Sequence, residues 1–495
     1  MSHQPDLILR DIRFYGGESR HDLLLSGGRV AEIAPAGRLG APGVQIVECD
    51  GRFVGPGLWD EHTHFTQWVI RQQRFDLAGT DSAADVLALV RTVLASTSLP
   101  AGEVVAGYGF RDAVWPDAPT LRALDEIAPD RPVVLISGDL HCAWINTAAA
   151  KLANVSVGET GLLREGDWIG APMDALGRGR LPSLADYRDA ADAAASRGVI
   201  GIVDYENTDN STEWPDRVAN GVTSLRVEGA IWPDRLEESI AAGLRTGQAL
   251  DPDGLITVGR LKIVVDGSLN TRTAFCWDPY PSLGPEAPHR CGILSVEPHE
   301  VRRLLERADR NGILPAVHAI GDRANTEVID AFEELKIPGI IEHAQLVSEK
   351  DFARFAPAGL IASVQPEHAM DDRDAADLHW AGRTGRAFAF GSLHAAGATL
   401  RLGSDAPVAP LDPWQAISAA TTRARDEREP WHPEQRLDLA VALSSSARGR
   451  TTIDVGSVAD LIILDRDPFR ISDADLRGMT VTATLLGGRF TWTTL

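Results

Sequence analysis

The sequence contains few cysteines, and they are spread along the chain. The 495 residues include four, with no CxxC pair: Cys49, Cys142, Cys276 and Cys291. This spacing excludes a disulfide framework and a zinc ribbon, and it favours a reducing compartment. The chain also lacks an apolar run of the roughly 18 residues that a membrane span needs, and its N-terminal segment lacks a secretory-signal pattern. We therefore expect a soluble, cytoplasmic protein.

Basic residues are scarce relative to acidic ones. Lys and Arg total 48 and Asp and Glu total 70, so the formal net charge is −22. A surface with this excess of negative charge repels the phosphate groups of nucleic acids and anionic lipids. We therefore expect a small-molecule substrate and no nucleic-acid or membrane partner. Hydrophobic residues make up 44% and charged residues 24%, a globular composition that excludes a disordered or fibrous protein. The length allows about three domains, or one elaborated barrel with an added module.

Short β-rich segments separated by Gly and Pro occupy both ends of the chain. They span residues 7–14, 22–28, 29–35 and 44–51 at the start and 459–465 and 481–492 at the end. Such runs indicate strands and turns. We expect the two ends, residues 1–54 and 440–495, to meet and form one small β domain.

The centre alternates buried-strand candidates with amphipathic helical segments such as 299–312 and 323–335. The strand candidates are 58–64, 198–206, 224–231, 259–267, 313–321, 339–345, 359–366 and 399–407. Eight such strands with helical crossovers predict an α/β fold, a (β/α)8 barrel over residues 55–439. Residues 66–190 are too long for a crossover and carry their own strand-like runs, which predicts an inserted lobe after the first barrel strand.

A histidine pair, His62 and His64, closes the first predicted strand. Residues i and i+2 of a strand share a face, so both imidazoles can turn toward one ion. The pair alone is a weak signal, because a surface or packing pair has the same spacing. Its position at the end of a barrel strand, where barrel active sites form, strengthens the metal-binding interpretation.

Four further residues extend this pattern along the chain. His318, His343 and Asp405 end later strands, and Lys262 lies inside a buried one. A lone histidine is usually structural, and a buried lysine is costly unless a carboxylate pairs with it or a reaction removes its charge. Carbamylation is such a reaction, and it produces a carboxylate-like group that can bridge two cations. Because six candidate ligands converge on one rim of the barrel, the sequence predicts a metal centre.

Long local stretches of the sequence resemble the amidohydrolase superfamily and, within it, the amidohydrolase-3, YtcJ-like group of metal-dependent hydrolases. They are 55–64, 132–146, 158–165, 261–274, 317–324, 341–347, 363–368, 403–417 and 456–465. The resemblance covers nearly the whole chain and implies a (β/α)8 barrel with a β-sandwich built from both chain ends. Residues 166–184 look abbreviated and Gly-rich beside typical relatives, which makes transfer of a relative's substrate unsafe.

The resemblance also implies a set of ligands. It assigns His62 and His64 to one metal, His318 and His343 to a second, a carbamylated Lys262 to the bridge between them, and Asp405 to the first metal. Imidazole and carboxylate ligands suit Zn2+, two per chain, and Fe2+ or Mn2+ could replace it. Occupancy by one metal stays open, and homodimerisation is compatible with such a barrel.

The implied activity is hydrolysis of a non-peptide carbon–nitrogen bond of a small molecule, with linear N-acyl or N-formyl amides first. A metal-bound hydroxide would attack the carbonyl, with Asp405 as general base and then general acid. The alternatives are a deaminase or cyclic amidase using the same site, and a catalytically silent scaffold. Lys262 favours a two-metal amidase over a deaminase, and the presence of all six ligands argues against the scaffold.

Four further residues near the predicted rim are candidates for supporting roles. Arg272, His368 and His141 are candidates for substrate contact. Arg272 could instead pair with one of the many acids, and His368 could relay protons or be a loop histidine. His141 lies in the inserted lobe and could close over the site. Asp266 either orients the metal site from the strand that carries Lys262 or belongs to the turn that follows.

Overall fold

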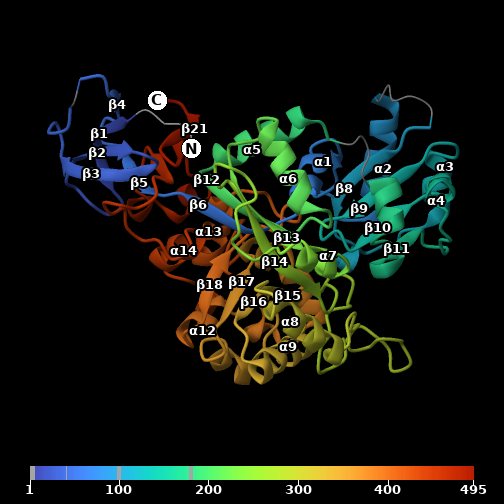
Figure 1. The fold of residues 1–495 in the computed structure, drawn as a ribbon. Helices are drawn as coiled ribbons and strands as arrows, with labels where there is room; N and C mark the ends of the chain where they lie inside the picture. The colour runs from blue at the N-terminus through green and yellow to red at the C-terminus, as the bar shows by residue number, and fades with distance from the viewer. Residues whose placement is uncertain (1–5, 41, 97–101, 178–181) are drawn as a thin grey trace.

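A nearly closed ring of parallel strands forms the centre of the protein in a computed structural model that describes residues 6–40, 42–96, 102–177 and 182–495 (Figure 1). The strands are β6 (Leu58–Thr63), β12 (Val199–Asp204), β13 (Arg226–Ile231), β14 (Ile256–Val264), β15 (Pro315–Ala319), β16 (Gly339–His343), β17 (Leu360–Val364) and β18 (Thr399–Leu402). Each strand pairs in parallel with the next one in this order. A parallel bridge between Thr63 and Ala406 brings the first and last strands together. The predicted (β/α)8 barrel is therefore confirmed.

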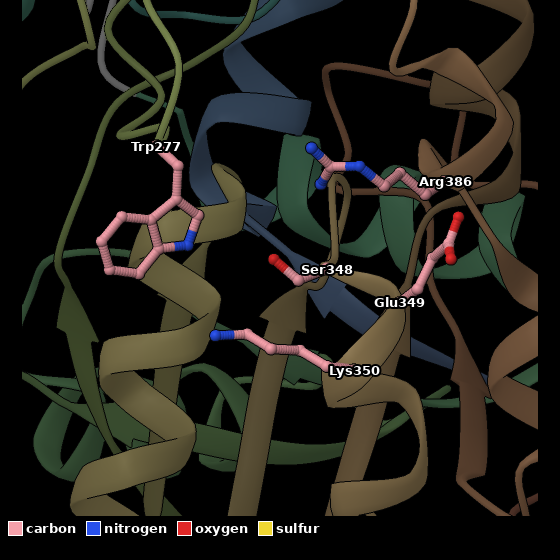
Figure 2. A pocket seen from close by; sticks show the side chains of 5 residues that line it. All are labelled: Trp277, Ser348, Glu349, Lys350 and Arg386. Carbon is pink, nitrogen blue, oxygen red and sulfur yellow. The ribbon is translucent and has the colours of Figure 1, made fainter.

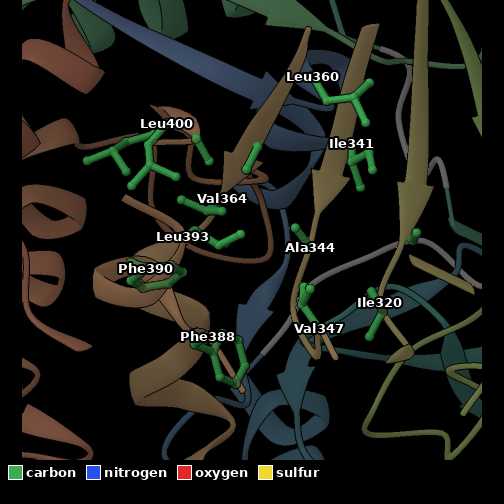
Figure 3. Close-up of a cluster of buried hydrophobic side chains, with 14 of the residues drawn as sticks. Ile320, Ile341, Ala344, Val347, Leu360, Val364, Phe388, Phe390, Leu393 and Leu400 are labelled. Atoms are coloured by element: carbon green, nitrogen blue, oxygen red, sulfur yellow. The ribbon is translucent and has the colours of Figure 1, made fainter. Parts of the chain in front are cut away.

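Helices cover the outside of this barrel. They are α5 (Leu184–Ala195), α6 (Asn210–Ala219), α7 (Leu236–Ala241), α8 (Pro298–Asp309), α9 (Asp322–Leu335), α10 (Pro366–Asp371), α11 (Arg373–His379), α12 (Phe390–Ala395), α13 (Pro413–Thr422) and α14 (Leu439–Ser446). Alternate strand residues point outward, so that Val364 of β17 faces Phe390 and Leu393 of α12 in the main core (Figure 3). Burial of these apolar faces holds each ligand-bearing strand in place.

Charged residues lie inside the barrel beside the metal-binding candidates. Arg448, which follows α14, makes ion pairs with Glu61 of β6 and Glu228 of β13, and Arg401 of β18 pairs with Glu61. Glu61 is buried, so these contacts supply the partners that a buried charge requires. The arrangement ties α14 to three barrel strands.

The two chain ends share one β domain, with blue and red strands side by side in Figure 1. Its strands are β1 (Leu7–Phe14), β2 (His21–Ser26), β3 (Arg29–Pro35), β4 (Gln45–Glu48), β5 (Phe53–Pro56), β19 (Leu461–Leu464), β20 (Val481–Leu486) and β21 (Arg489–Thr493). Strand β5 pairs antiparallel with β19, which joins the two ends. The predicted terminal β-sandwich is confirmed, whereas its boundaries at residues 54 and 440 stay predictions. Residues 1–5 and 41 of that prediction lie outside the described ranges.

An inserted lobe follows β6 and α1 (Phe65–Arg71), as expected. It contains β7 (Phe75–Asp76), α2 (Ala83–Ser96), β8 (Val105–Phe110), α3 (Leu121–Ile127), β9 (Val133–Ser137), β10 (Cys142–Ile145), α4 (Thr147–Ala153) and β11 (Leu162–Arg164). These strands form a separate five-stranded sheet, in the order β11-β10-β9-β8-β7. Ion pairs from Arg111 to Asp371 and Asp372, at the end of α10, join the lobe to the barrel. Residues 97–101 of the predicted lobe and 178–181 of the Gly-rich stretch lie outside the described ranges.

Helix length and composition bear on the membrane question. Within the described ranges, no helix combines the length and the apolar character that crossing a membrane demands.

Candidate metal centre

The carboxyl ends of the barrel strands bring the six predicted ligands to one site. His62 lies on β6 and His64 follows it, Lys262 lies on β14, His318 on β15 and His343 on β16, and Asp405 follows β18. The imidazole ring centroids of His318 and His343 are 4.4 Å apart, those of His62 and His343 are 4.9 Å apart, and those of His62 and His64 are 5.6 Å apart. Residues that are up to 343 positions apart in the sequence thus share one side of the barrel.

Three of these residues converge on a point that one ion could occupy. One ligand atom each of His62, His343 and Asp405 lies within 4.8 Å of the other two. Asp405 Oδ1 is 3.4 Å from Nε2 of both His62 and His64. The converging set takes one histidine from each of the two predicted pairs, so two ions held by these pairs would be neighbours.

Buried nitrogen atoms without hydrogen-bond partners test whether the residues fit a metal. Nε2 of His318 and Nδ1 of His343 are buried and accept no hydrogen bond. Such an atom is costly in a protein interior unless a ligand satisfies it, and an imidazole lone pair is a preferred ligand of Zn2+. The donor set of imidazole nitrogen and carboxylate oxygen also suits Fe2+ and Mn2+. The residues present fit a divalent transition metal.

Unusual backbone conformations orient the side chains of two of the ligands. Asp405 has φ 57° and His343 has φ 73°, in a region that residues other than glycine seldom adopt. The amide of Asp405 donates a hydrogen bond to the carbonyl of His62, with N···O 2.7 Å, which fixes the turn beside the histidine pair. Strained conformations of this kind concentrate at functional sites, where the surrounding structure maintains them.

Burial sets the charge state of the ligands. It lowers the pKa values of His62, His318 and His343 well below the usual value, which keeps these imidazoles neutral as ligands must be. Burial raises the pKa of Asp405, but the hydrogen bond and charge of His64 outweigh it and leave this pKa below its usual value. Asp405 is therefore ionised at neutral pH.

Lys262 has an unusual environment for an amine. Its side chain is buried, and its Nζ lies 3.2 Å from His62 Nε2 and 4.1 Å from the ring centroid of Tyr205. Burial lowers the pKa of Lys262 to about 8. Among the described residues, no carboxylate oxygen lies within 4.0 Å of this Nζ, and the charges of Glu342 and Asp405 act on it from farther away.

A glutamate that sequence reasoning missed contacts the first ligand. Glu342 Oε2 lies 2.6 Å from His62 Nδ1, and Glu342 Oε1 accepts a hydrogen bond of 2.7 Å from the hydroxyl of Tyr205. Burial raises the pKa of Glu342 to about 7. Glu342 lies in a five-residue strand that is buried throughout. A carboxylate in such a strand needs partners, and this feature of the sequence could have identified Glu342 as a functional candidate.

Asp266 orients the segment that follows His318. Its carboxylate accepts hydrogen bonds from the backbone amides of Phe275, Ile320 and Gly321, at 2.8 to 3.0 Å. Asp266 Oδ1 also lies 3.5 Å from Nε2 of His318. Burial raises the pKa of Asp266 to about 7. Asp266 therefore stabilises the backbone that follows β14 and β15, and it also lies beside the imidazole of His318.

A cavity of about 470 Å3 opens onto the ligands, between the barrel and the inserted lobe. Apolar side chains form much of its wall, including Leu140, Ile169 and Met173 of the lobe and Trp232 of the barrel. Sequence reasoning missed Trp232, which follows β13. The volume is within the range of small-molecule sites.

The lobe presents His141 to this cavity, as expected from its place in the sequence. Its Nδ1 lies 2.8 Å from Glu165 Oε2, and Glu165 Oε1 accepts hydrogen bonds of 2.5 Å from Thr271 and Thr273 in the segment after β14. Burial lowers the pKa of His141, but the charge and hydrogen bond of Glu165 raise it overall to about 9. Glu165 thus links His141 of the lobe to Thr271 and Thr273 of the barrel, and this link fixes the orientation of the imidazole.

His368 and Arg272, the other two candidates for substrate contact, differ in position. His368 lies on α10, lines the cavity, and places its Nε2 3.8 Å from Asp405 Oδ2. Arg272 does not line the cavity, and the charged groups that act on it are those of Arg164 and Asp112. The substrate contact predicted for Arg272 therefore has no geometric support.

A second hollow, also of about 470 Å3, contains none of the six predicted ligands (Figure 2). Trp277, a residue that is 46% exposed, forms one side, and Lys350 and Arg386 point into the space from other segments. Arg386 also pairs with the buried Asp322, with N···O 2.7 Å. This hollow provides sites for control substitutions that leave the metal centre unchanged.

Comparisons with known proteins identify similar chains. The model described as "Amidohydrolase family" matches residues 45–492. The N-substituted formamide deformylase of Arthrobacter pascens is 25% identical, over 99% of this chain and 98% of the relative. The putative amidohydrolase YtcJ of Bacillus subtilis is 26% identical, over 92% of each chain. A solved structure of an uncharacterized metal-dependent hydrolase from Pyrococcus horikoshii has a TM-score of 0.76 and 26% identity, over 95% of this chain and 99% of that one.

Proposed function

Because this chain belongs to the amidohydrolase family, it is a metal-dependent hydrolase of carbon–nitrogen bonds, and we propose that it cleaves linear N-formyl or N-acyl amides of small molecules. The convergence of six potential ligands beneath a cavity of about 470 Å3 is the observation that carries this proposal. The likeness to a formamide deformylase over nearly the whole chain supports a formyl group in particular.

The proposed centre holds two Zn2+ ions, which Fe2+ or Mn2+ could replace. His62 and His64 would bind one ion, His318 and His343 the other, and a carbamylated Lys262 would bridge them, with Asp405 on the first. The ions would polarise the substrate carbonyl and make hydroxide available at neutral pH. The lowered pKa values of His62, His318 and His343, which keep these imidazoles neutral, support this assignment.

Asp405 is the proposed general base and acid. Its pKa lies below the usual value, so its carboxylate can take a proton from the attacking water. The same proton then passes to the amide nitrogen as the carbon–nitrogen bond breaks, which releases an amine and a carboxylic acid. His368 Nε2, 3.8 Å from Asp405 Oδ2, is placed to assist this transfer.

The lobe side of the cavity would hold the rest of the substrate. His141, fixed by Glu165, would donate a hydrogen bond to an oxygen atom of the substrate. The apolar side chains of Leu140, Ile169 and Met173 favour an apolar group on the amide nitrogen.

Purified protein loaded with Zn2+ in the presence of bicarbonate tests this proposal. We expect about two metal ions per chain and release of amine from N-formyl or N-acyl amines carrying apolar groups. Loss of this activity in Asp405→Asn, with Lys350→Ala as a control from the second hollow, would tie it to the site. Release of ammonia from ring amines, with one metal per chain and an unmodified Lys262, would replace the proposal with a deaminase. Absence of bound metal would favour a silent scaffold.

A further inference from the structure

The first metal ligand has a support that depends on two other buried side chains. Tyr205, which follows β12, donates its hydroxyl proton to Glu342 Oε1, with O···O 2.7 Å, and Glu342 Oε2 lies 2.6 Å from His62 Nδ1. All three side chains are fully buried, with 0% of each residue exposed. The three residues come from different strands of the barrel or their ends, so only the folded barrel brings them together.

These contacts determine which nitrogen of His62 is available to a metal. Lys262 Nζ, a hydrogen-bond donor, lies 3.2 Å from Nε2 of His62, so Nε2 is the acceptor and Nδ1 carries the proton in the contact with Glu342. The lone pair then resides on Nε2, which faces Lys262 Nζ at 3.2 Å and Asp405 Oδ1 at 3.4 Å. The tyrosine hydroxyl occupies the second carboxylate oxygen of Glu342 and fixes the plane of the group.

Tyr205 also contacts the site through its ring and its backbone. Its ring centroid is 4.5 Å from that of His62 and 4.1 Å from Lys262 Nζ. Its backbone amide donates a hydrogen bond to the carbonyl of Thr63, between His62 and His64, with N···O 2.7 Å. A change at Tyr205 therefore reaches the histidine pair by two routes.

His318 provides an internal contrast. The carboxylate beside it, that of Asp266, has Oδ1 3.5 Å from Nε2 of His318, whereas Glu342 Oε2 lies only 2.6 Å from Nδ1 of His62. A carboxylate partner raises the basicity of an imidazole and strengthens its bond to a metal more than a neutral carbonyl does. Glu342 does not line the cavity, so it acts on the ligand and not on the substrate.

We propose that Glu342 and Tyr205 are positioning residues that fix the tautomer and orientation of His62 and thereby set the metal affinity of this centre. The proposal rests on the metal site of the proposed function, but it is independent of the substrate.

The test measures the affinity for Zn2+ by competition with a chromophoric chelator. We expect Glu342→Gln, which keeps the shape of the side chain but removes its charge, to weaken Zn2+ binding by about ten- to hundredfold. Tyr205→Phe removes one hydrogen bond and should weaken binding by about two- to fivefold. In Co2+-loaded protein, the visible absorption spectrum of both variants should differ from that of the wild type, a change that a purely structural role would not produce.

Glu228→Gln is the matched control. Glu228 also lies inside the barrel, on β13, but it pairs with Arg448 and not with a histidine. We expect this variant to retain wild-type Zn2+ affinity even if its thermal stability falls. Equal Zn2+ affinity of the wild type, Glu342→Gln and Tyr205→Phe would overturn the inference and leave the proposed function intact. Failure of the wild type to bind Zn2+ would overturn both. If Glu342→Gln does not fold, Tyr205→Phe alone decides.

Discussion

The two walls of the cavity are built in different ways. On the barrel side, Lys262, His318 and His343 project from strands that are hydrogen-bonded to a neighbouring strand on each edge, whereas β6, which carries His62, pairs with β12 and meets the last strand through a single bridge. All four residues are at most 5% exposed. On the lobe side, the wall consists of residues outside regular strands, such as Leu140 and His141 between β9 and β10. The barrel wall is therefore built on paired strands, whereas the lobe wall is built on loops that side-chain contacts such as that of His141 with Glu165 hold in place.

From this difference we expect the barrel wall to carry out the reaction and the lobe wall to determine which substrates are accepted. Ligands of a metal must be placed to within fractions of an ångström, and paired strands of a closed barrel provide that precision. Residues that contact variable parts of a substrate need only complement its shape, and loops on a rigid scaffold can change without disturbing the ligands. We expect substitutions on the barrel wall to abolish activity and substitutions on the lobe wall to alter it.

Asp405→Asn should give the largest effect. We expect turnover to fall by about 10³-fold, because an amide cannot take up the proton, while bound metal is retained. The measurement combines amine release with metal analysis of the same preparation. Activity close to that of the wild type would remove Asp405 from the proton transfer and, with it, the assignment of chemistry to the barrel wall.

Lys262→Ala should have the next largest effect. Loss of the bridging group should lower metal content and reduce turnover by about 10²-fold. Because the substitution leaves a buried space beside His62 Nε2, acetate or formate should restore part of the activity by supplying a carboxylate there. Lys350→Ala, at the second hollow, should behave as the wild type. An active Lys262→Ala that acetate does not stimulate would contradict a carbamylated lysine.

The barrel wall was predictable from the sequence because its pattern is local. A period of two places His62 and His64 on one face, and ends of buried strands mark His318, His343 and Asp405. All eight predicted barrel strands correspond to strands of the structure, within a few residues at each end. The partners of these residues were not predictable, because Glu342 meets His62 across 280 positions of sequence.

The lobe wall was less predictable for the same reason. His141 was a candidate, but its dependence on Glu165, Thr271 and Thr273 arises only when the lobe meets the segment after β14. Arg272 belongs to that same segment, and its φ of 62° reflects a turn that the sequence pattern did not reveal. Contacts between the lobe and the barrel join residues that are far apart in the chain, and such contacts leave no periodic pattern in the sequence.

His141→Asn changes the lobe wall and leaves the metal ligands in place. The variant loses the hydrogen bond that we propose to reach the substrate, so kcat/KM should fall by about ten- to hundredfold while metal content stays at the wild-type level. Steady-state kinetics and metal analysis measure the two quantities separately. His394→Asn, on α12, is the matched control, since His394 does not line the cavity. Loss of metal in His141→Asn would show that the two walls are not independent.

The pH dependence of stability should give the smallest effect, and it arises from the contact between His141 and Glu165. The pKa of His141 is raised from 6.5 to about 9, so its contribution to the free energy of unfolding is complete below pH 6.5 and is lost as pH rises through 9. The pKa of Glu165 is lowered from 4.5 to about 2, so its contribution is complete above pH 4.5 and is lost as pH falls toward 2. The two contributions together are greatest between pH 4.5 and 6.5.

Comparison of the wild type with Glu165→Gln isolates this contribution. The two side chains are only 18% and 20% exposed, so we expect a difference of about 1 kcal/mol in stability at pH 6 that becomes much smaller at pH 9.5. Urea unfolding at both pH values, followed by fluorescence, measures it. A difference that is the same at pH 6 and pH 9.5 would mean that Glu165 stabilises the lobe through Thr271 and Thr273 alone. The lobe wall would then be anchored without the charge of His141.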